Sequence, residues 1–500
     1  MTVSDRCLTA QSIVLAMQQR IRTIMGHMAG RRKKFLGCAP IAFWACILSG
    51  QTPPTLAIVH ATVIDGTGSP ALKDRAVLIQ GDRIVAVSPA SGFQLPKSIQ
   101  VVDASGKYLI PGLWDMHVHM RGSKNGSGPD FADENAALLP LYLANGITGV
   151  REMGGDLLAD VLKWRSQILN GERLGPRIVT CGRKLDGPRP EWPGSIAIST
   201  PEEARSAVRR VKAIGADFVK VYNEVPNIPR EAYLALLDEA KKQHMSVTGH
   251  VPLTLTVAEV SYMGQDIEHY NEYLVGCTHN ERALKSDLLA DRMGGGEYES
   301  AVVHGYNPNV ARALFSKFAA NHTWVTPTLV IAHQLATANK RSGPGPRLQY
   351  LGARWLATWT DREEVADELD KLRYRQALDS VRLMYRIGVF LLAGSDTGAS
   401  NGGTFPGFSL QDELAYLVQA GLTPMEALQC ATLNAASWLG QQDNLGTIEV
   451  GKLADLVLLD ANPLRDIHNI GRIRAVVFNG QLLDRSRLNR MLAAVRDRSE

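Results

Sequence analysis

An alternation of strand-like and helix-like segments over residues 111–446 constrains the fold of this chain more than any other feature. The strand-like segments are short apolar runs, expected at 108–119, 146–150, 177–180, 217–222, 246–250, 266–269, 324–329 and 389–394. Thr200-Pro-Glu-Glu203 and Thr423-Pro-Met-Glu426 mark helix starts between them, because both are capping boxes with proline at the first helical position. Eight such βα units predict an α/β fold, a (β/α)8 TIM-type barrel over residues 111–446.

Short alternating strands flank this region on both sides. They are expected at 57–64, 76–80 and 83–87 before it, and at 454–459, 473–478 and 481–483 after it. Asn479-Gly480 supplies a tight hairpin turn between the last two. Because so few short strands cannot bury a core alone, we expect one small β-sandwich domain built from both chain ends, residues 53–110 together with 447–490.

The N-terminal segment has the pattern of an export signal. Four basic residues, Arg31-Arg-Lys-Lys34, precede an apolar run at 35–50 that ends in small residues. This run is shorter than the roughly 20 residues that a membrane span needs. We expect residues 1–52 to be an export signal or disordered leader, and the protein to be periplasmic or extracellular. An uncleaved N-terminal membrane anchor is the alternative.

Charge and cysteine usage exclude several classes of protein. The formal net charge is +4 and no basic stripe occurs outside the N-terminus, so nucleic acid is not an expected partner. The six cysteines include no Cys-x-x-Cys pair, which argues against a zinc knuckle or a thioredoxin-like redox site. The expected partner is a small amide or peptide substrate, and homo-oligomer formation stays open.

Histidines, a lysine and an aspartate occur where the expected strands end. His117 and His119 are one residue apart, and residues i and i+2 of a strand point to one face, so both imidazoles are placed to share a cation. The other strand-end residues are Lys220, His250, His269 and Asp396. Active sites of (β/α)8 barrels lie at the carboxyl ends of the strands, so these six side chains are the expected site.

Lys220 lies inside an apolar run, where a charged ammonium is heavily penalised. A lysine in such a place has a depressed pKa and reacts as a free amine. Addition of CO₂ to this amine would produce a carbamate whose two oxygens bridge two metal ions. An ion-paired lysine, or one that reaches solvent, is the alternative.

These residues, together with Pro111-Gly112 before them, resemble the amidohydrolase superfamily, and more closely its imidazolonepropionase-like branch with the bacterial Xaa-Pro dipeptidases. The resemblance extends over nearly the whole chain after the leader, including residues 446–457. It implies two divalent metal ions, with zinc expected and manganese or cobalt as alternatives. The metal ligands that it implies are His117, His119 and Asp396 for the more buried ion, His250 and His269 for the second, and carboxylated Lys220 between them.

The same resemblance implies a hydrolase that cleaves the amide bond of a dipeptide or N-acyl amino acid. A metal-bridging hydroxide would attack, while Asp396 takes its proton and returns it to the leaving nitrogen. Deaminases of the superfamily have a glutamate three residues after the histidine of the fifth strand, whereas this chain has Leu253 there. Deamination is therefore disfavoured. The alternatives are a cyclic amidase, an esterase or lactonase using the same site, and a metal-retaining binding protein without turnover.

Two further residues are candidates for substrate contact. Tyr222 shares the face of Lys220 and is placed to donate a hydrogen bond to a substrate carbonyl in binding and catalysis, with core packing as the alternative. Arg151 is a candidate for holding a substrate carboxylate, with pairing to Glu152 as the alternative. The intervals 276–321 and 333–361 are expected to be lid or specificity loops, or plain surface insertions. Four histidines in or beside them have no assigned role: His279, His304, His322 and His333.

Overall fold

The structure is a computed structural model, and it describes residues 55–499 except 92–94, 96–97, 122–130, 191, 193, 223–226, 339–344, 357–365 and 399–402. The expected leader, residues 1–52, lies outside the described residues. Within the described part of the chain, none of the helices is long and apolar enough to cross a membrane. Export therefore stays a prediction.

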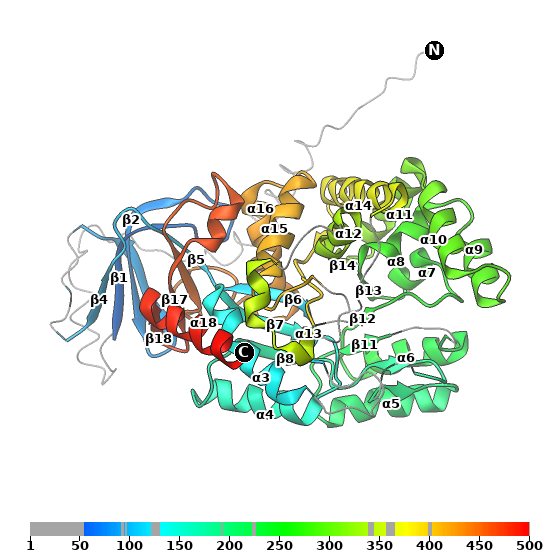
Figure 1. The fold of residues 1–500 in the computed structure, drawn as a ribbon, viewed down its shortest axis with the longest axis horizontal. Helices are drawn as coiled ribbons and strands as arrows, with labels where there is room; N and C mark the ends of the chain where they lie inside the picture. The colour runs from blue at the N-terminus through cyan, green and yellow to red at the C-terminus, as the bar shows by residue number, and fades with distance from the viewer. Residues whose placement is uncertain are drawn as a thin grey trace, which may run out of the picture. The chain divides into compact units, whose positions relative to one another are not determined.

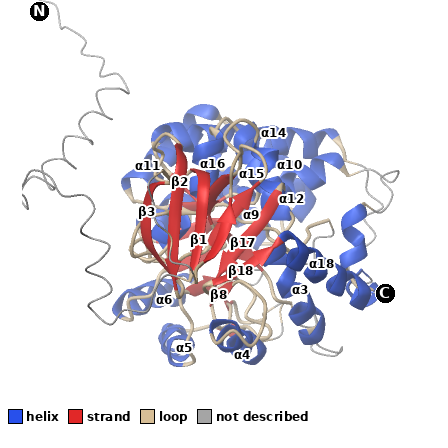
Figure 2. Ribbon diagram, turned by 90° about the vertical axis from the view of Figure 1, so that its left-hand side faces the viewer, coloured by secondary structure: helices blue, strands red, loops and turns tan. Residues whose placement is uncertain are grey.

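The two chain ends form one eight-stranded sheet, in the order β18-β17-β16-β5-β1-β2-β3, with β4 beside β1. Its strands are β1 (Leu56–Val63), β2 (Leu72–Gln80), β3 (Arg83–Pro89), β4 (Gln100–Asp103), β5 (Tyr108–Pro111), β16 (Leu456–Leu459), β17 (Ile473–Phe478) and β18 (Gln481–Asp484). The ends meet where Val457 of β16 lies opposite Ile110 of β5 and Val476 of β17. This sheet faces the viewer in Figure 2. The expected pairing of strands from both chain ends is confirmed.

The remaining strands are parallel and form two sheets. One contains β6 (Leu113–Val118), β7 (Ile147–Glu152) and β8 (Arg177–Thr180). The other has the order β10-β9-β11-β12-β13-β14-β15, with β9 (Leu185–Asp186), β10 (Ile196–Ala197), β11 (Val219–Val221), β12 (Val247–Gly249), β13 (Gln265–Glu268), β14 (Trp324–Thr326) and β15 (Phe390–Leu391). The eight strands expected from the sequence correspond to β6, β7, β8 and β11 to β15, while the short strands β9 and β10 were not expected.

Backbone hydrogen bonds join the two parallel sheets at both edges. The Met116 N–H in β6 donates to Ala393 O at 2.9 Å, and Val118 forms a parallel bridge with Thr397. At the other edge the Asp217 N–H, just before β11, donates to Thr180 O of β8 at 2.9 Å. The segments that carry the expected site residues are therefore held in register with one another.

The first expected strand, 108–119, is two strands in the structure. β5 belongs to the eight-stranded sheet and β6 to a parallel sheet, and Gly112 lies between them. A Cβ atom at Gly112 would lie 2.2 Å from Thr148 Oγ1, so only glycine fits this crossing. The apolar run leading to His117 thus connects the terminal sheet directly to the site.

Helices alternate with the parallel strands, as expected, and cover them in Figure 1. The first group is α3 (Ala132–Ala144), α4 (Leu158–Leu169), α5 (Pro201–Ala213), α6 (Arg230–Lys242), α7 (Val257–Tyr262) and α8 (Tyr270–Leu274). The second is α12 (Leu329–Thr337), α13 (Ala353–Leu356), α14 (Glu368–Ile387), α15 (Ser409–Gln419), α16 (Pro424–Cys430), α17 (Leu433–Trp438) and α18 (Arg485–Ser499), with short 3₁₀ turns η3 (Pro346–Tyr350) and η4 (Ile467–Gly471). Both expected capping boxes are confirmed, with the Thr200 and Thr423 side chains accepting from the Glu203 and Glu426 N–H groups.

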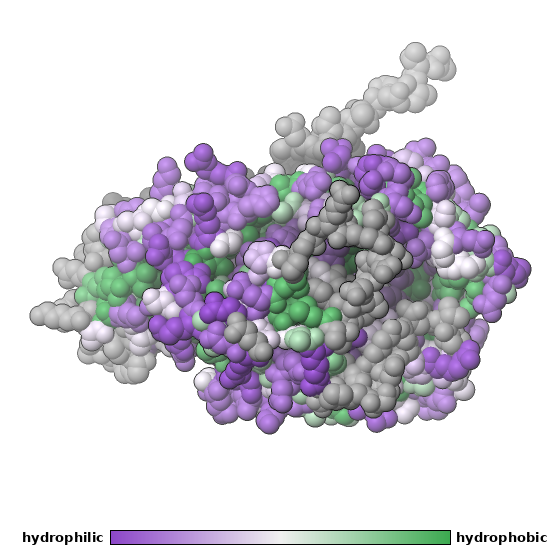
Figure 3. Space-filling view, viewed as in Figure 1, coloured by the Kyte–Doolittle hydropathy of each residue, from purple (hydrophilic) through white to green (hydrophobic). Residues whose placement is uncertain are grey.

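The interval 276–321, expected to be a lid or specificity loop or a plain surface insertion, is largely helical. It contains the end of η2 (Val275–Cys277), then α9 (Glu281–Leu289), α10 (Gly295–His304) and α11 (Pro308–Ala320). Val302, Leu314 and Phe318 are buried against the main core. This interval therefore has a packed apolar face, which its polar and glycine-rich composition concealed. The face of the molecule in Figure 3 is mostly hydrophilic, as expected where helices present their charged sides to solvent.

Candidate active site

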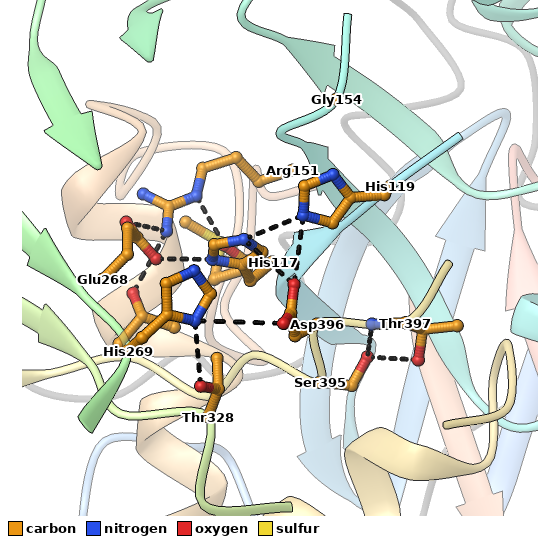
Figure 4. Close-up of polar contacts among 12 residues, drawn as sticks. His117, His119, Arg151, Gly154, Glu268, His269, Thr328, Ser395, Asp396 and Thr397 are labelled. Atoms are coloured by element: carbon orange, nitrogen blue, oxygen red, sulfur yellow. Dashed lines mark hydrogen bonds and ion pairs between the residues drawn. The ribbon is translucent and has the colours of Figure 1, made fainter. Parts of the chain in front are cut away.

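Two histidines and an aspartate meet where β6 ends. His117 Nε2 lies 3.2 Å from His119 Nε2, and His119 Nε2 lies 3.0 Å from Asp396 Oδ1. His117 Nε2 lies 3.4 Å from the same oxygen. The His117 side chain is fully buried, and Figure 4 shows the three side chains pointing toward one another. Sequence reasoning correctly grouped these residues.

His269 and His250 lie beside this cluster. His269 Nδ1 lies 4.0 Å from Asp396 Oδ2, and ligand atoms of His117, His269 and Asp396 lie within 4.8 Å of one another. The His250 and His269 ring centroids are 5.0 Å apart. Three imidazoles therefore lie within 4.0 Å of the Asp396 carboxylate, and His250 lies beside the His269 ring.

The backbone is strained at two of these residues. His269 has φ of 64° and Asp396 has φ of 51°, both in the left-handed region that residues other than glycine rarely adopt. Successive residues of a strand point to opposite faces, yet Glu268 and His269 both reach the site. The positive φ at His269 is what turns its ring to the same side as Glu268. Backbone strain of this kind is found mainly at functional sites, and packing elsewhere in the fold compensates for its free-energy cost.

Lys220 lies at the middle of β11 with no exposed surface. Among the described residues its Nζ has no hydrogen-bond partner. Burial lowers the pKa of this amine to about 8, even though the charges of Glu268 and Asp396 oppose the shift. A buried amine without a partner fits the expectation that Lys220 carries a carboxyl group in the working protein.

The side chains present fit divalent metal ions. Burial lowers the pKa of His117 and of His269 well below the ordinary value, so both rings are neutral and offer lone pairs. Asp396 Oδ1 is buried, and its close neighbours among the described residues are the Nε2 atoms of His119 and His117. Neutral imidazoles and a carboxylate that converge in this way are the donor set of zinc and related metals.

Glu268 organises the site, although sequence reasoning did not select it. Its Oε2 lies 2.7 Å from His117 Nδ1, and its Oε1 accepts hydrogen bonds from Arg151 Nη2 at 2.6 Å and from the Thr248 hydroxyl. Although burial opposes ionisation, Arg151 and Lys220 hold the pKa of Glu268 below its usual value. The carboxylate therefore accepts a hydrogen bond from the His117 Nδ1–H group, which leaves Nε2 facing Asp396 with its lone pair. The only signal in the sequence was its position directly before His269.

Glu272 has the same relation to His250. Its Oε1 lies 3.0 Å from His250 Nδ1, and its Oε2 accepts a hydrogen bond from the Val251 N–H at 2.8 Å. His250 is thereby held with Nε2 available to the site. Glu268 lies one residue before His269 and Glu272 lies three residues after it. Neither spacing belongs to a sequence motif that would have indicated these roles.

The expectation for Arg151 is wrong. Its side chain has no exposed surface, and Nε donates to Met116 O at 2.6 Å while Nη2 donates to Glu268. Its guanidinium carbon lies 4.3 Å from the ring centroid of Trp438. The alternative pairing with Glu152 is also wrong, because Glu152 accepts from the Gly154 and Gly155 N–H groups instead. Arg151 therefore supports the site from beneath and does not face a substrate.

Tyr222 lies in the expected place. Its ring centroid is 4.8 Å from that of His250, and it lines a cavity of about 490 Å³ together with His119, His269 and Asp396. The four unassigned histidines are not among the described residues that line this cavity. His333 instead lies 2.9 Å from the Tyr416 hydroxyl through Nδ1.

The Glu268 network leads to a test of stability. We expect Glu268→Gln to lower the free energy of unfolding by about 2–4 kcal/mol, because a buried Arg151 charge and the His117 N–H lose their shared anion. Denaturant unfolding measures this loss. Glu202→Gln, at a 77% exposed glutamate on α5, is the control and should stay within about 0.5 kcal/mol of wild type. Equal stability of both variants would show that Glu268 does not hold the network.

Comparisons with known proteins agree with this geometry. The model of the amidohydrolase family matches residues 108–483. Ochratoxinase from Aspergillus niger is 24% identical over 482 residues, covering 86% of this chain and 86% of ochratoxinase. Adenine deaminase from Rubrobacter xylanophilus is 32% identical over 434 residues, covering 84% of this chain but 56% of the deaminase. The solved structure of a Xaa-Pro dipeptidase with methionine bound in its active site is 23% identical, with a TM-score of 0.62, covering 86% of this chain and 99% of the dipeptidase.

The family match extends over most of the chain and includes every residue of the site described above. The dipeptidase structure supports the mixed α/β fold in particular. Because the donor set, the fold and the family match agree, the chain belongs to the amidohydrolase family, a family of metal-dependent hydrolases acting on carbon–nitrogen bonds.

Proposed function

We propose that this protein is a two-metal hydrolase that cleaves the amide bond of a dipeptide or an N-acyl amino acid. The observation that carries the proposal is the convergence of four imidazoles, Asp396 and the buried amine of Lys220 beside a cavity of about 490 Å³. A cavity of this volume suits a dipeptide-sized ligand. The resemblance of the fold to a Xaa-Pro dipeptidase points the same way.

His117, His119 and Asp396 would hold one ion, His250 and His269 the second, and carboxylated Lys220 would lie between them, with zinc as the proposed metal. When bound, such ions supply Lewis acidity, acidifying water near neutral pH and polarising a carbonyl oxygen.

The protein's own side chains supply the proton transfers and the orientation. Asp396 is placed to take a proton from the attacking water and to pass it to the leaving nitrogen. Glu268 and Glu272 fix the orientations of His117 and His250, so that the rings do not have to reorganise during the reaction. The Tyr222 hydroxyl, beside His250, is placed to donate to the substrate carbonyl oxygen.

The proposal includes a closed fold around this site. We propose that β6, β7, β8 and β11 to β15 form a (β/α)8 barrel over residues 111–446, supported by the hydrogen bonds that join the two parallel sheets at both edges. We also propose that residues 53–110 and 447–490 form a β-sandwich domain, supported by the eight-stranded sheet. The leader at 1–52 would export the protein to the periplasm or the cell exterior, which the N-terminal residue of the mature protein would test.

Metal removal tests the proposed function. We expect a chelator to reduce hydrolysis of a dipeptide and N-acyl amino acid panel by at least about a hundredfold, and zinc with bicarbonate to restore it, because both the nucleophile and the carbonyl polarisation depend on the ions. Metal content is measured by atomic emission on the same samples. Tight metal without turnover of any amide would instead favour a binding protein, and ammonia release from adenine would favour a deaminase.

A further inference from the structure

The cavity beside the proposed metal site is lined by two groups of residues. Helices α8 to α10 and α12 contribute Leu274, Val302 and Ile331, together with the charged side chains of Glu272, Lys285 and Glu299. A second group, which we name the polar wall, includes Arg121, Asp156, Lys184, Trp192 and Tyr222. A substrate in this cavity therefore meets charged side chains from both groups.

The polar wall holds two cations against one indole ring. Lys184 Nζ lies 4.7 Å from the ring centroid of Trp192 and 2.8 Å from Asp156 Oδ1. Arg121 Cζ lies 5.8 Å from the centroid of the same ring. Arg121 and Lys184 are only 6% and 2% exposed, so both cations are fixed in a low-dielectric place. We name Arg121, Lys184 and Trp192 the basic corner.

The basic corner adjoins the proposed metal site through neighbouring residues. Arg121 follows His119 by two positions. Trp192 contacts Tyr222 edge-on with ring centroids 6.4 Å apart, and Tyr222 contacts His250 at 4.8 Å. Residues of one cavity lining therefore lead from the two cations to the histidines.

We propose that the basic corner binds a carboxylate of the substrate, with Arg121 and Lys184 as donors; this rests on the proposed hydrolysis of an amide at the adjacent site. The attraction between a buried cation and an anion is strongest when both lie in the same low-dielectric space. A guanidinium and an ammonium together supply directional donors and charge, and the Trp192 ring lies beside both cations.

The basic corner defines a substrate class. The substrate carries a free carboxylate beside the scissile amide, as in an N-acyl amino acid or a dipeptide. Uncharged cyclic amides and esters lack the group that the basic corner recognises. The corner is thus a determinant of specificity.

The test compares an acid with its amide. We expect the metal-loaded protein to bind L-phenylalanine more tightly than L-phenylalaninamide by calorimetry, and to hydrolyse Leu-Phe faster than Leu-Phe amide. Lys184→Met should reduce both preferences by about ten- to a hundredfold, mainly through binding and KM, because one charge-assisted contact is lost. Lys184→Arg should restore part of the preference. Asp156→Asn combined with Lys184→Met removes the whole ion pair, and guards against misfolding caused by an isolated buried carboxylate.

Lys285→Met is the matched control, because Lys285 lines the same cavity on the α9 side and pairs with Glu281 at 2.9 Å. It should leave the acid-to-amide ratio as in wild type. Equal affinity of the wild-type protein for acid and amide would overturn the proposal. An acid-to-amide ratio that stays as in wild type in both Lys184→Met and the double variant with Asp156→Asn would also overturn it. Loss of the acid preference in Lys285→Met alone would also overturn the proposal, because it would place the substrate carboxylate beside α9 and not at the basic corner. Acid-selective binding that depends on Lys184, without hydrolysis of any amide, would support the corner while refuting the proposed reaction.

Discussion

Lys220→Met is expected to abolish turnover while making the metal-free protein more stable. Lys220 Nζ is buried and has no hydrogen-bond partner among the described residues, so the metal-free fold bears the cost of desolvating an amine. Methionine fills nearly the same volume without a polar group. We expect the free energy of unfolding of the metal-free variant to rise by about 1–3 kcal/mol.

The same substitution removes the group that would become the bridging carbamate. We expect bound metal to fall from about two ions per chain to one or fewer, and turnover to fall by at least about a thousandfold. Denaturant unfolding after chelation, metal content and kinetics are measured on one preparation. Lys285→Met is the control: Lys285 donates to Leu255 O at 2.8 Å and pairs with Glu281, so its loss should destabilise the fold without changing metal content. Full metal occupancy and undiminished turnover in Lys220→Met would refute the two-metal site.

Asp396→Asn is expected to fold normally and to lose about a thousand- to ten-thousandfold in kcat. Asp396 adopts a φ of 51°, a left-handed conformation that asparagine tolerates better than most residues, so the substitution keeps the local backbone. An amide cannot accept and return a proton as the carboxylate does, which alone is worth about a hundred- to ten-thousandfold. It is also a weaker ligand beside His117 and His119.

Kinetics and metal content together separate the two roles of this residue. Metal retained with kcat reduced indicates loss of proton transfer, whereas metal lost as well indicates loss of a ligand. Asp396→Val is the contrasting variant, since a β-branched residue is strained at this φ and should lower the melting temperature. Normal kcat in Asp396→Asn would exclude Asp396 from the chemistry.

Much of the fold was accessible from local sequence patterns. Strands and helix starts follow from apolar periodicity and capping residues, each of which needs only a few neighbouring positions, and this is why eight strands and two capping boxes were located correctly. His117, His119, His250, His269 and Asp396 were found by the same means, because strand ends in a parallel array converge on one edge. The packed helices of interval 276–321 were not expected, because their apolar face is visible only once α9 to α11 pack on the core.

The sequence by itself determined which chemical groups this protein carries and at which strand ends they lie. Only the tertiary structure decided their partners. Arg151 and Glu268 are 117 residues apart, and His117 and Glu268 are 151 apart, so no local pattern connects them. Whether a carboxylate contacts a cation depends on how close the folded chain brings them. For buried side chains, this proximity decides whether a charged residue stabilises the fold or contacts a substrate. For this reason Arg151 became a support beneath the site, and the two cations beside Trp192 became the candidates for substrate recognition.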